Sequence, residues 1–133
     1  MTPPMCGYCN SEAVLVSATV VYGPSGRGNL WICPSWPDCD AYVGVHDGEI
    51  ARPKGTLANG PLRALRIKVH QVFDGQWKNG PDGKPRAVRG RNFARRQAYA
   101  RLAKLMGREG QSVHIGEFDV NQCLEALMQL EAK

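Results

Sequence analysis

The sequence predicts an α+β fold, in which an N-terminal unit of about three antiparallel strands, residues 1–50, is packed on a C-terminal three-helix unit, residues 51–133. Three observations predict it. Four of the five cysteines lie in two close pairs inside the N-terminal segment, and β-branched residues are concentrated between these pairs. After residue 60, three segments carry apolar residues at helical spacing. Because the connector is short, we expect the two parts to fold as one cooperative unit.

Three short strands are expected in the N-terminal unit. Residues 13–22 are rich in β-branched side chains and end at the turn-forming segment 23–29, which contains Gly, Pro and Ser. Residues 30–33 and 40–46 are two further candidates, and they flank the second cysteine pair. Trp31 is expected to pack in the small core of this unit. Residues 47–60, which follow the third strand, are a connector that contains Gly, Pro and Asn.

The first helix is predicted over about residues 61–78. Asn59 is placed to cap its N-terminus, just before Pro61. Arg66 falls inside the apolar stripe and His70 lies at its edge, so we expect both to be buried and paired rather than catalytic. The segment 79–85 is a loop, because Gly, Pro, Asn and Asp cluster there. The stripe consists of Leu62, Leu65, Val69, Val72, Phe73 and Trp77.

The second helix is predicted over about residues 91–106 and is ended by Gly107. The segment 112–118 is either a short strand or a turn, with His114 packed against the last helix. The apolar stripe of the second helix consists of Ala94, Ala98, Leu102, Leu105 and Met106.

The last helix is predicted to begin at Asp119 and to run to about Glu131. Asp119 is the N-cap, and Gln122 three residues later completes a capping box. Cys123 occupies an apolar position and is expected to be a buried core thiol. The residues expected to face inward are Leu124, Leu127 and Met128.

The cysteine spacing predicts a metal site. Cys6 and Cys9 are separated by two residues, 23 residues follow, and Cys33 and Cys39 are separated by five. A pair at the first spacing directs two thiolates at one point, and a second pair from a neighbouring hairpin completes a tetrahedron around zinc. A redox pair or disulfides are disfavoured, because strand signals follow the first pair and nothing indicates secretion. His46 stays an alternative ligand to one cysteine.

Composition excludes several classes of protein. The chain has 133 residues, of which 43% are hydrophobic and 22% are charged, as in ordinary globular domains. No apolar run approaches the roughly 20 residues of a transmembrane helix, and the first residues lack the features of a signal peptide. We therefore expect a cytoplasmic protein.

The net charge of +5 hides an asymmetry along the chain. Residues 84–108 hold nine basic residues and no acidic ones, whereas the remainder holds eight basic and twelve acidic residues. Such a block favours a polyanionic partner. We expect the first two arginines to lie on a mobile arm and the others on the second helix. The candidates for nucleic-acid contact in this block are Arg86, Arg89, Arg91, Arg95, Arg96, Arg101 and Lys104.

Two residues of the N-terminal unit extend this list. Trp36 lies between the cysteines of the second pair and is a better candidate than Trp31 for stacking on a base. Arg27 lies in the turn segment 23–29 and is a further candidate for nucleic-acid contact beside Trp36. We expect the loops of this unit and the basic block to form one contact surface.

The second cysteine pair resembles the second half of the C-terminal zinc ribbons of bacterial type IA topoisomerases. In those ribbons a Cys-x2-Cys knuckle is followed by an aromatic residue, a Cys and a short loop that ends in aromatic-Pro-x-Cys. The matching residues here are Cys6, Cys9, Trp31, Cys33, Trp36, Pro37 and Cys39. The resemblance implies a zinc-ribbon fold with structural zinc. Those ribbons contact single-stranded DNA.

The whole chain is more similar to a family of phage and bacterial zinc-finger-containing proteins of uncharacterised function. The similarity extends past the ribbon through the segments VGVH, GTLAN, AYARLAKLMG and HIGEFDVNQC. It implies zinc and a phage or prophage origin, and it implies no reaction.

These observations predict a small nucleic-acid-binding protein that contacts phosphates, with DNA favoured over RNA. The alternative is a phage-type accessory protein that binds and modulates a host protein. We expect no enzyme, because the three histidines have no spacing typical of acid–base chemistry and a four-thiolate site cannot activate water.

Overall fold

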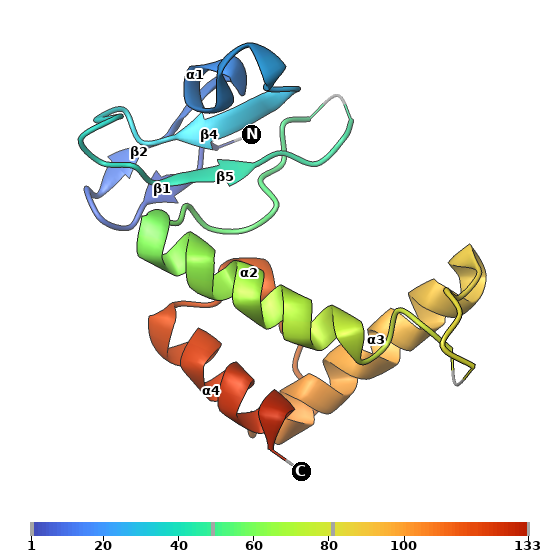
Figure 1. Ribbon diagram of the computed structural model, residues 1–133. Coiled ribbons are helices and arrows are strands. Elements are labelled where there is room, and N and C mark those ends of the chain that lie inside the picture. Colours follow the sequence, from blue (N-terminus) through green and yellow to red (C-terminus); the bar gives the residue numbers. More distant parts are fainter. Residues whose placement is uncertain (1, 49, 81, 133) are drawn as a thin grey trace. The chain divides into compact units, whose positions relative to one another are not determined.

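The computed structural model describes residues 2–48, 50–80 and 82–132. Its fold class is α+β, as the sequence predicts, with the strands in the N-terminal part and three long helices after them (Figure 1). The chain divides into two compact units, Met1–Arg63 and Ala64–Lys133. The division falls inside the first turn of the helix Gly60–Gly75. We describe each unit by itself.

Unit 1 contains two small antiparallel sheets. Strands β1 (Met5–Cys6) and β2 (Ser11–Glu12) pair around the first cysteine knuckle. Strands β3 (Val14–Ser17), β4 (Asn29–Ile32) and β5 (Tyr42–Gly44) form a second sheet in the order β3-β4-β5. Trp31 in the central strand lies opposite Leu15 and Val43. The expected meander of about three antiparallel strands is therefore confirmed.

The strand predicted over residues 13–22 is wrong in its second half. Strand β3 ends at Ser17, and a short helix α1 (Thr19–Tyr22) and a 3-10 turn η1 (Gly23–Ser25) follow it. The backbone folds back on itself here, because the Ala18 N–H donates to the Gly28 carbonyl at 2.9 Å. A Cβ atom on Gly26 would lie 2.6 Å from the Ala18 carbonyl oxygen. This tertiary contact overrides the β-propensity of the valines.

The three-stranded sheet of unit 1 has a small hydrophobic core on each of its two faces. Trp31 belongs to the first core, as expected, and its Nε1–H donates to the Ala51 carbonyl at 2.8 Å. The other buried residues of this core are Cys6, Ala13, Cys33, Ala41 and Leu57. The second core is formed by Ala18, Leu30 and Ile32, with Val16, Val21, Trp36 and Tyr42 packed against it.

Three longer helices follow, and their existence confirms the prediction. Helix α2 (Gly60–Gly75) begins in unit 1, where the Leu62 N–H donates to Asn59 Oδ1 at 3.1 Å, so Asn59 is the cap. Helix α3 (Val88–Leu105) starts three residues before the predicted start. Helix α4 (Val120–Glu131) has the predicted capping box between Asp119 and Gln122. The segment expected to be a strand or turn contains a 3-10 turn, η2 (Ile115–Glu117).

Contacts between helices hold unit 2 together. Arg66 of α2 is buried, and its Nε–H donates to the Phe118 carbonyl at 3.0 Å, as expected for a buried, paired arginine. Gln76 Nε2 donates to the Leu130 carbonyl at 3.0 Å. Phe73 of α2 packs on Tyr99 of α3 with ring centroids 4.5 Å apart. Its largest fully buried side chains include Phe73, Leu102, Ile115 and Val69.

Several inward-facing assignments are wrong. Met128 is 72% exposed, and Leu124 of α4 and Leu105 of α3 are also exposed. The buried face of α4 consists of Cys123 and Leu127, as expected, together with Ala126 and Leu130. His114 is exposed rather than packed against α4. None of the described helices is long and apolar enough to cross a membrane.

Candidate metal centre and nucleic-acid interface

The first knuckle is shaped by its backbone. Cys6 ends β1, and the Asn10 N–H donates to the Cys6 carbonyl at 2.8 Å, which closes a tight turn around Cys9. Asn10 has a φ of +58°, in the left-handed region that asparagine tolerates better than most residues. The turn brings the two thiols of this pair to one side.

The second knuckle follows β4 directly. The Ser35 N–H donates to Cys33 Sγ at 3.4 Å, and the Trp36 N–H donates to the Cys33 carbonyl at 3.0 Å. The Cys39 N–H donates to the Ser35 carbonyl at 3.2 Å, which closes the five-residue loop. The longer spacing of this pair is therefore accommodated by a hydrogen-bonded turn that returns Cys39 to Cys33.

The four thiols converge. Their Sγ atoms all lie within 4.8 Å of one another, and the Cys6 and Cys39 Sγ atoms are 3.7 Å apart. A zinc ion with Zn–S bonds of about 2.3 Å would have sulfur atoms about 3.8 Å apart at tetrahedral geometry. Within the described residues, all five cysteines are free thiols, and His46 lies outside the cluster. The donor set therefore fits structural zinc with four thiolate ligands and no open position.

The thiols perturb one another. Burial raises the pKa of Cys33, but the Ser35 N–H and the thiols of Cys39, Cys9 and Cys6 outweigh burial, so this pKa is lowered. The Ala41 N–H lowers the pKa of Cys39, yet burial and the neighbouring thiols raise it to about 12. Protons are thus shared unequally among crowded sulfur atoms, and a bound zinc ion would displace them.

Comparison with protein families agrees with this geometry. Residues 2–133 match a family described as a zinc-finger-containing domain. The chain belongs to this family. No curated protein and no solved structure matches the chain significantly. The zinc finger of this family member is the thiol cluster of unit 1, and its four close thiols fit a structural zinc ion.

Trp36 of the zinc finger is partly used in packing. It is half-buried against the second core, and its ring meets Tyr42 edge-on with centroids 6.0 Å apart. Arg63 lies over the same Tyr42 ring, with its guanidinium carbon 4.0 Å from the centroid. Tyr22 extends this aromatic group and donates from its hydroxyl to the Tyr42 hydroxyl at 3.0 Å. Arg27 is exposed in the turn that follows η1.

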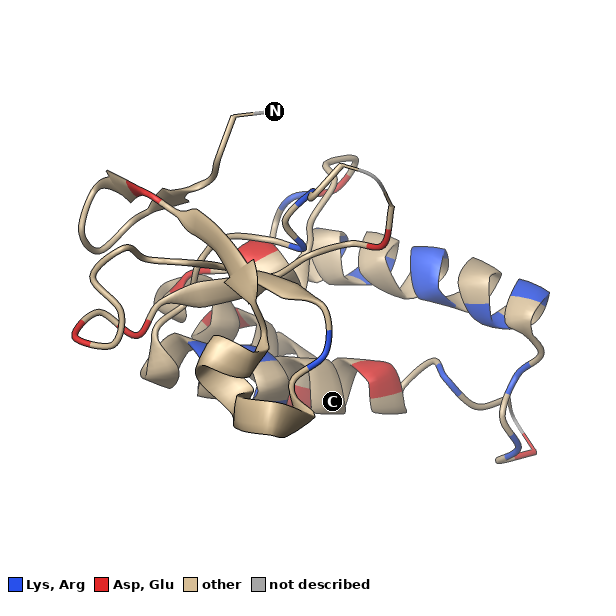
Figure 2. Cartoon of the chain, turned by 90° about the horizontal axis from the view of Figure 1, so that it is seen from above, with Lys and Arg blue, Asp and Glu red and all other residues tan. Residues whose placement is uncertain are grey.

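Helix α3 carries most of the predicted basic residues. Figure 2 shows basic residues recurring along this helix, and its sequence contains no Asp or Glu. The ion pairs Arg63–Asp40 and Lys78–Asp74 lie outside α3, and no described residue of α3 forms an ion pair. The exposed basic side chains of α3, here called the α3 basic surface, are Arg89, Arg91, Arg95, Arg96, Arg101 and Lys104.

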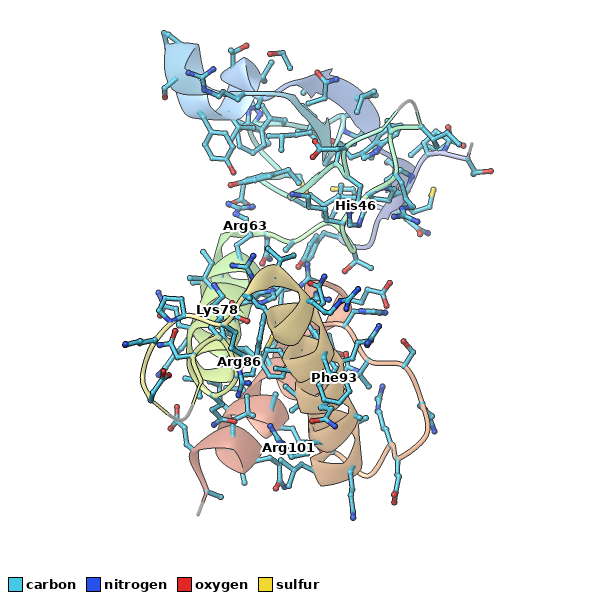
Figure 3. The ribbon with its side chains drawn as sticks, turned by 90° about the vertical axis from the view of Figure 1, so that its right-hand side faces the viewer. His46, Arg63, Lys78, Arg86, Phe93 and Arg101 are labelled. Atoms are coloured by element: carbon cyan, nitrogen blue, oxygen red, sulfur yellow. The ribbon has the colours of Figure 1, made fainter. Side chains whose placement is uncertain are left out.

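Arg86 differs from the rest of the basic block. Its Nε–H donates to the Trp77 carbonyl at 2.9 Å, and its backbone N–H donates to the Lys78 carbonyl at 3.2 Å (Figure 3). The expectation of a mobile arm is therefore wrong for Arg86, which is half-buried and anchored. It is also wrong for Arg89, which lies in the first turn of α3.

Sequence reasoning missed an aromatic residue on the α3 basic surface. Phe93 is 54% exposed and lies four residues after Arg89 and three before Arg96, so the three share one helix face (Figure 3). An exposed aromatic ring among arginines is typical of surfaces that stack on bases. Its helical spacing with the arginines was the signal that could have revealed it.

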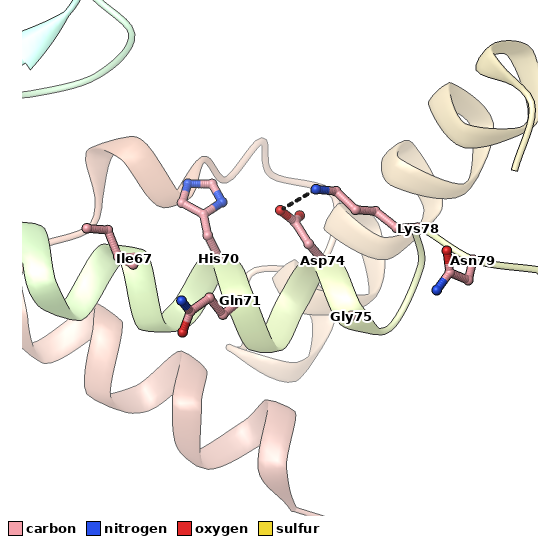
Figure 4. Close-up of a pocket in the computed structure, with 7 residues that line it drawn as sticks. All are labelled: Ile67, His70, Gln71, Asp74, Gly75, Lys78 and Asn79. Atoms are coloured by element: carbon pink, nitrogen blue, oxygen red, sulfur yellow. Dashed lines mark ion pairs between the residues drawn. The ribbon is translucent and has the colours of Figure 1, made fainter. Parts of the chain in front are cut away.

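A separate hollow of about 470 Å³ lies along α2 (Figure 4). His70, Asp74 and Lys78 contribute its titratable groups, and Lys78 Nζ is 3.5 Å from Asp74 Oδ2. Burial lowers the pKa of His70, which keeps the imidazole neutral at neutral pH. Because its charges compensate one another, this hollow does not extend the α3 basic surface.

Proposed function

We propose that this zinc-finger protein binds nucleic acid through backbone phosphates, with DNA favoured over RNA. The observation that carries the proposal is the α3 basic surface, whose six exposed cations have no acidic residue on their own helix and no ion pair among the described residues. Arg91 and Arg95 are four residues apart and Arg101 and Lys104 are three apart, so each pair of like charges repels, and phosphates would relieve that repulsion.

The start of α3 strengthens this argument. Arg89 and Arg91 lie in the first turns of the helix, its first turn has no acidic residue, and Ala87 supplies no side-chain cap. The N-terminus of a helix carries partial positive charge, so cations there are unfavourable unless an anion is close. A phosphate would be stabilised by both the free N–H groups and the arginines.

Aromatic side chains supply the second part of the proposal. Phe93 on α3 would stack on bases, and Trp36 with Arg27 would do so on the zinc finger. Zinc holds the loop that carries Trp36 and takes no part in chemistry, since four thiolates leave no coordination position for water. We therefore propose a binding protein rather than an enzyme.

The experiment is fluorescence anisotropy with labelled single-stranded DNA, double-stranded DNA and RNA at increasing salt. Phosphate binding predicts an affinity that falls steeply with salt, with about 0.7 units of log–log slope per contact on a single strand. Arg101→Gln with Lys104→Gln should reduce that slope by about two contacts. Arg52→Gln with Lys54→Gln removes the same charge from exposed residues of unit 1 and is the matched control. No binding at low salt would exclude this function.

One observation favours a second candidate, the binding of a host protein by a phage-type accessory protein. Val120, Leu124 and Met128 are exposed at intervals of four residues and form an apolar stripe on α4. Such stripes dock into grooves of protein partners. A salt-resistant, nuclease-resistant partner in a pull-down from host lysate, lost in Leu124→Glu but kept in Arg101→Gln, would support this candidate.

A further inference from the structure

A hollow of about 280 Å³ lies beside α3 in unit 2. Arg95 and Arg96 line it from the helix, and Ser112 and His114 line it from the segment that leads to η2. Ser112 Oγ and His114 Nε2 are 3.1 Å apart, so these two side chains are already held together. Tyr99, Ala100, Gln111 and Val113 complete the wall.

Tyr99 gives the hollow a rigid floor. Its ring packs on Phe73 of α2 at 4.5 Å and on His114 at 5.9 Å. Arg95 lies over the ring with its guanidinium carbon 4.9 Å from the centroid. A cation that rests on a fixed aromatic ring loses less conformational freedom when it binds an anion.

We infer that this hollow binds one nucleotide unit of the nucleic-acid strand. Arg95, Arg96 and the Ser112 hydroxyl would bind its phosphate, and the exposed His114 ring would stack on its base. The inference rests on the proposed function and adds to it a defined subsite, which contains two residues, Ser112 and His114, that lie outside the basic block.

The chemistry and size of the hollow fit this ligand. Two guanidinium groups and a hydroxyl are donors suited to phosphate oxygens. No acidic side chain is among the described residues that line the hollow, so no carboxylate there would repel a phosphate. Its volume of about 280 Å³ lies just below the roughly 300–1,000 Å³ of small-molecule sites, which suits one nucleotide unit better than a larger cofactor.

The first experiment tests the subsite with a small probe on the full-length, zinc-loaded protein. Thymidine monophosphate is titrated into isotope-labelled protein, and thymidine without phosphate is the control ligand. We expect the monophosphate to shift the amide signals of Ser112 and His114 and the Arg95 Nε–H signal, while thymidine, which offers only the base, should leave the Ser112 and Arg95 signals in place. Absence of these shifts, or equal shifts along the whole of α3, would overturn the subsite.

The second experiment compares variants that remove equal charge. Arg95→Gln with Arg96→Gln should weaken oligonucleotide binding roughly tenfold more than Arg101→Gln with Lys104→Gln, because hydrogen-bonded charge contacts add to the general field. Ser112→Ala changes no charge and should weaken binding about threefold, whereas Ser25→Ala in unit 1 should have no effect. Equal losses in the two double variants would contradict the inference.

Two substitutions of His114 distinguish a stacking role of its ring from a purely structural one. His114→Ala should lose at least about fivefold in affinity, and His114→Phe, which keeps an aromatic face, should retain most of it. If the wild-type protein fails to bind any oligonucleotide at low salt, the proposed function fails. If it binds and these variants bind equally well, the subsite alone fails.

Discussion

The five cysteines divide into two chemical groups. Four lie in the zinc finger, where their sulfur atoms converge, and Cys123 lies alone in the core of unit 2. Burial raises the pKa of Cys123, so less of it is thiolate at neutral pH, and thiolate is the form that reacts with alkylating agents. Metal protects the first group and burial protects the second.

This difference predicts a two-stage pattern of alkylation. In zinc-loaded protein, iodoacetamide at neutral pH should modify few thiols. After a chelator removes zinc, the four zinc-finger cysteines should react while Cys123 stays unmodified, because its protection does not depend on metal. Mass spectrometry of tryptic peptides measures each site, and denatured protein is the control in which all five react. Equal modification of Cys123 and Cys9 after zinc removal would contradict this division.

At the residue scale, spacing predicted the metal ligands but not the proposed phosphate subsite. The Cys-x2-Cys spacing fixes the local geometry, because a two-residue separation directs both thiols at one point. Ser112 and His114 approach Arg95 only because the segment after α3 turns back along the helix, and no periodicity encodes that return. Arg86 also looked free in the sequence, because its acceptor, the Trp77 carbonyl, belongs to the backbone.

At the element scale, α4 shows how local sequence can define a helix start. The Gln122 N–H donates to Asp119 Oδ1 at 2.8 Å, and the Asp119 N–H donates to Gln122 Oε1 at 2.9 Å. Both members of the capping box are therefore satisfied, which is why this start was predicted to the residue.

Removing this cap should destabilise unit 2. Asp119→Ala leaves the Gln122 N–H without its side-chain acceptor and should reduce the free energy of unfolding by about 1 kcal/mol. Glu125→Ala, at an exposed position within the same helix, is the matched control and should change it by less than about 0.5 kcal/mol. Urea unfolding followed by circular dichroism at 222 nm measures both. Equal effects would mean that the cap contributes no more than an ordinary surface residue.

Elsewhere the same kind of reasoning failed for physical reasons. The buried face of α4 includes Cys123 and Ala126, small side chains that contribute little to an apolar stripe in the sequence, so Leu124 and Met128 were assigned inward. In α1, valines that favour a strand adopt a helical turn because the chain must fold back to place Gly26 against Ala18. In both cases packing with distant residues decided between local alternatives.

At the scale of the whole molecule, α2 links the two compact units. Its first residues belong to unit 1, where Asn59 caps it and Arg63 donates to the carbonyl groups of Asp40 and Ala58. The zinc finger thus organises the start of a helix whose remaining turns belong to unit 2. This continuity is the physical basis for expecting cooperative folding of the whole chain.

Removal of zinc tests that expectation. Unit 1 buries few large side chains besides Trp31, Leu30 and Ile32, so we expect it to unfold without metal. Loss of the Asn59 cap should then cost α2 about 1 kcal/mol and lower the thermal midpoint at 222 nm by about 4–8 °C. Re-addition of zinc should restore the midpoint, and Cys123→Ala should keep its response to chelator, because that residue binds no metal. A helical transition unchanged by chelator would show instead that the two units fold independently.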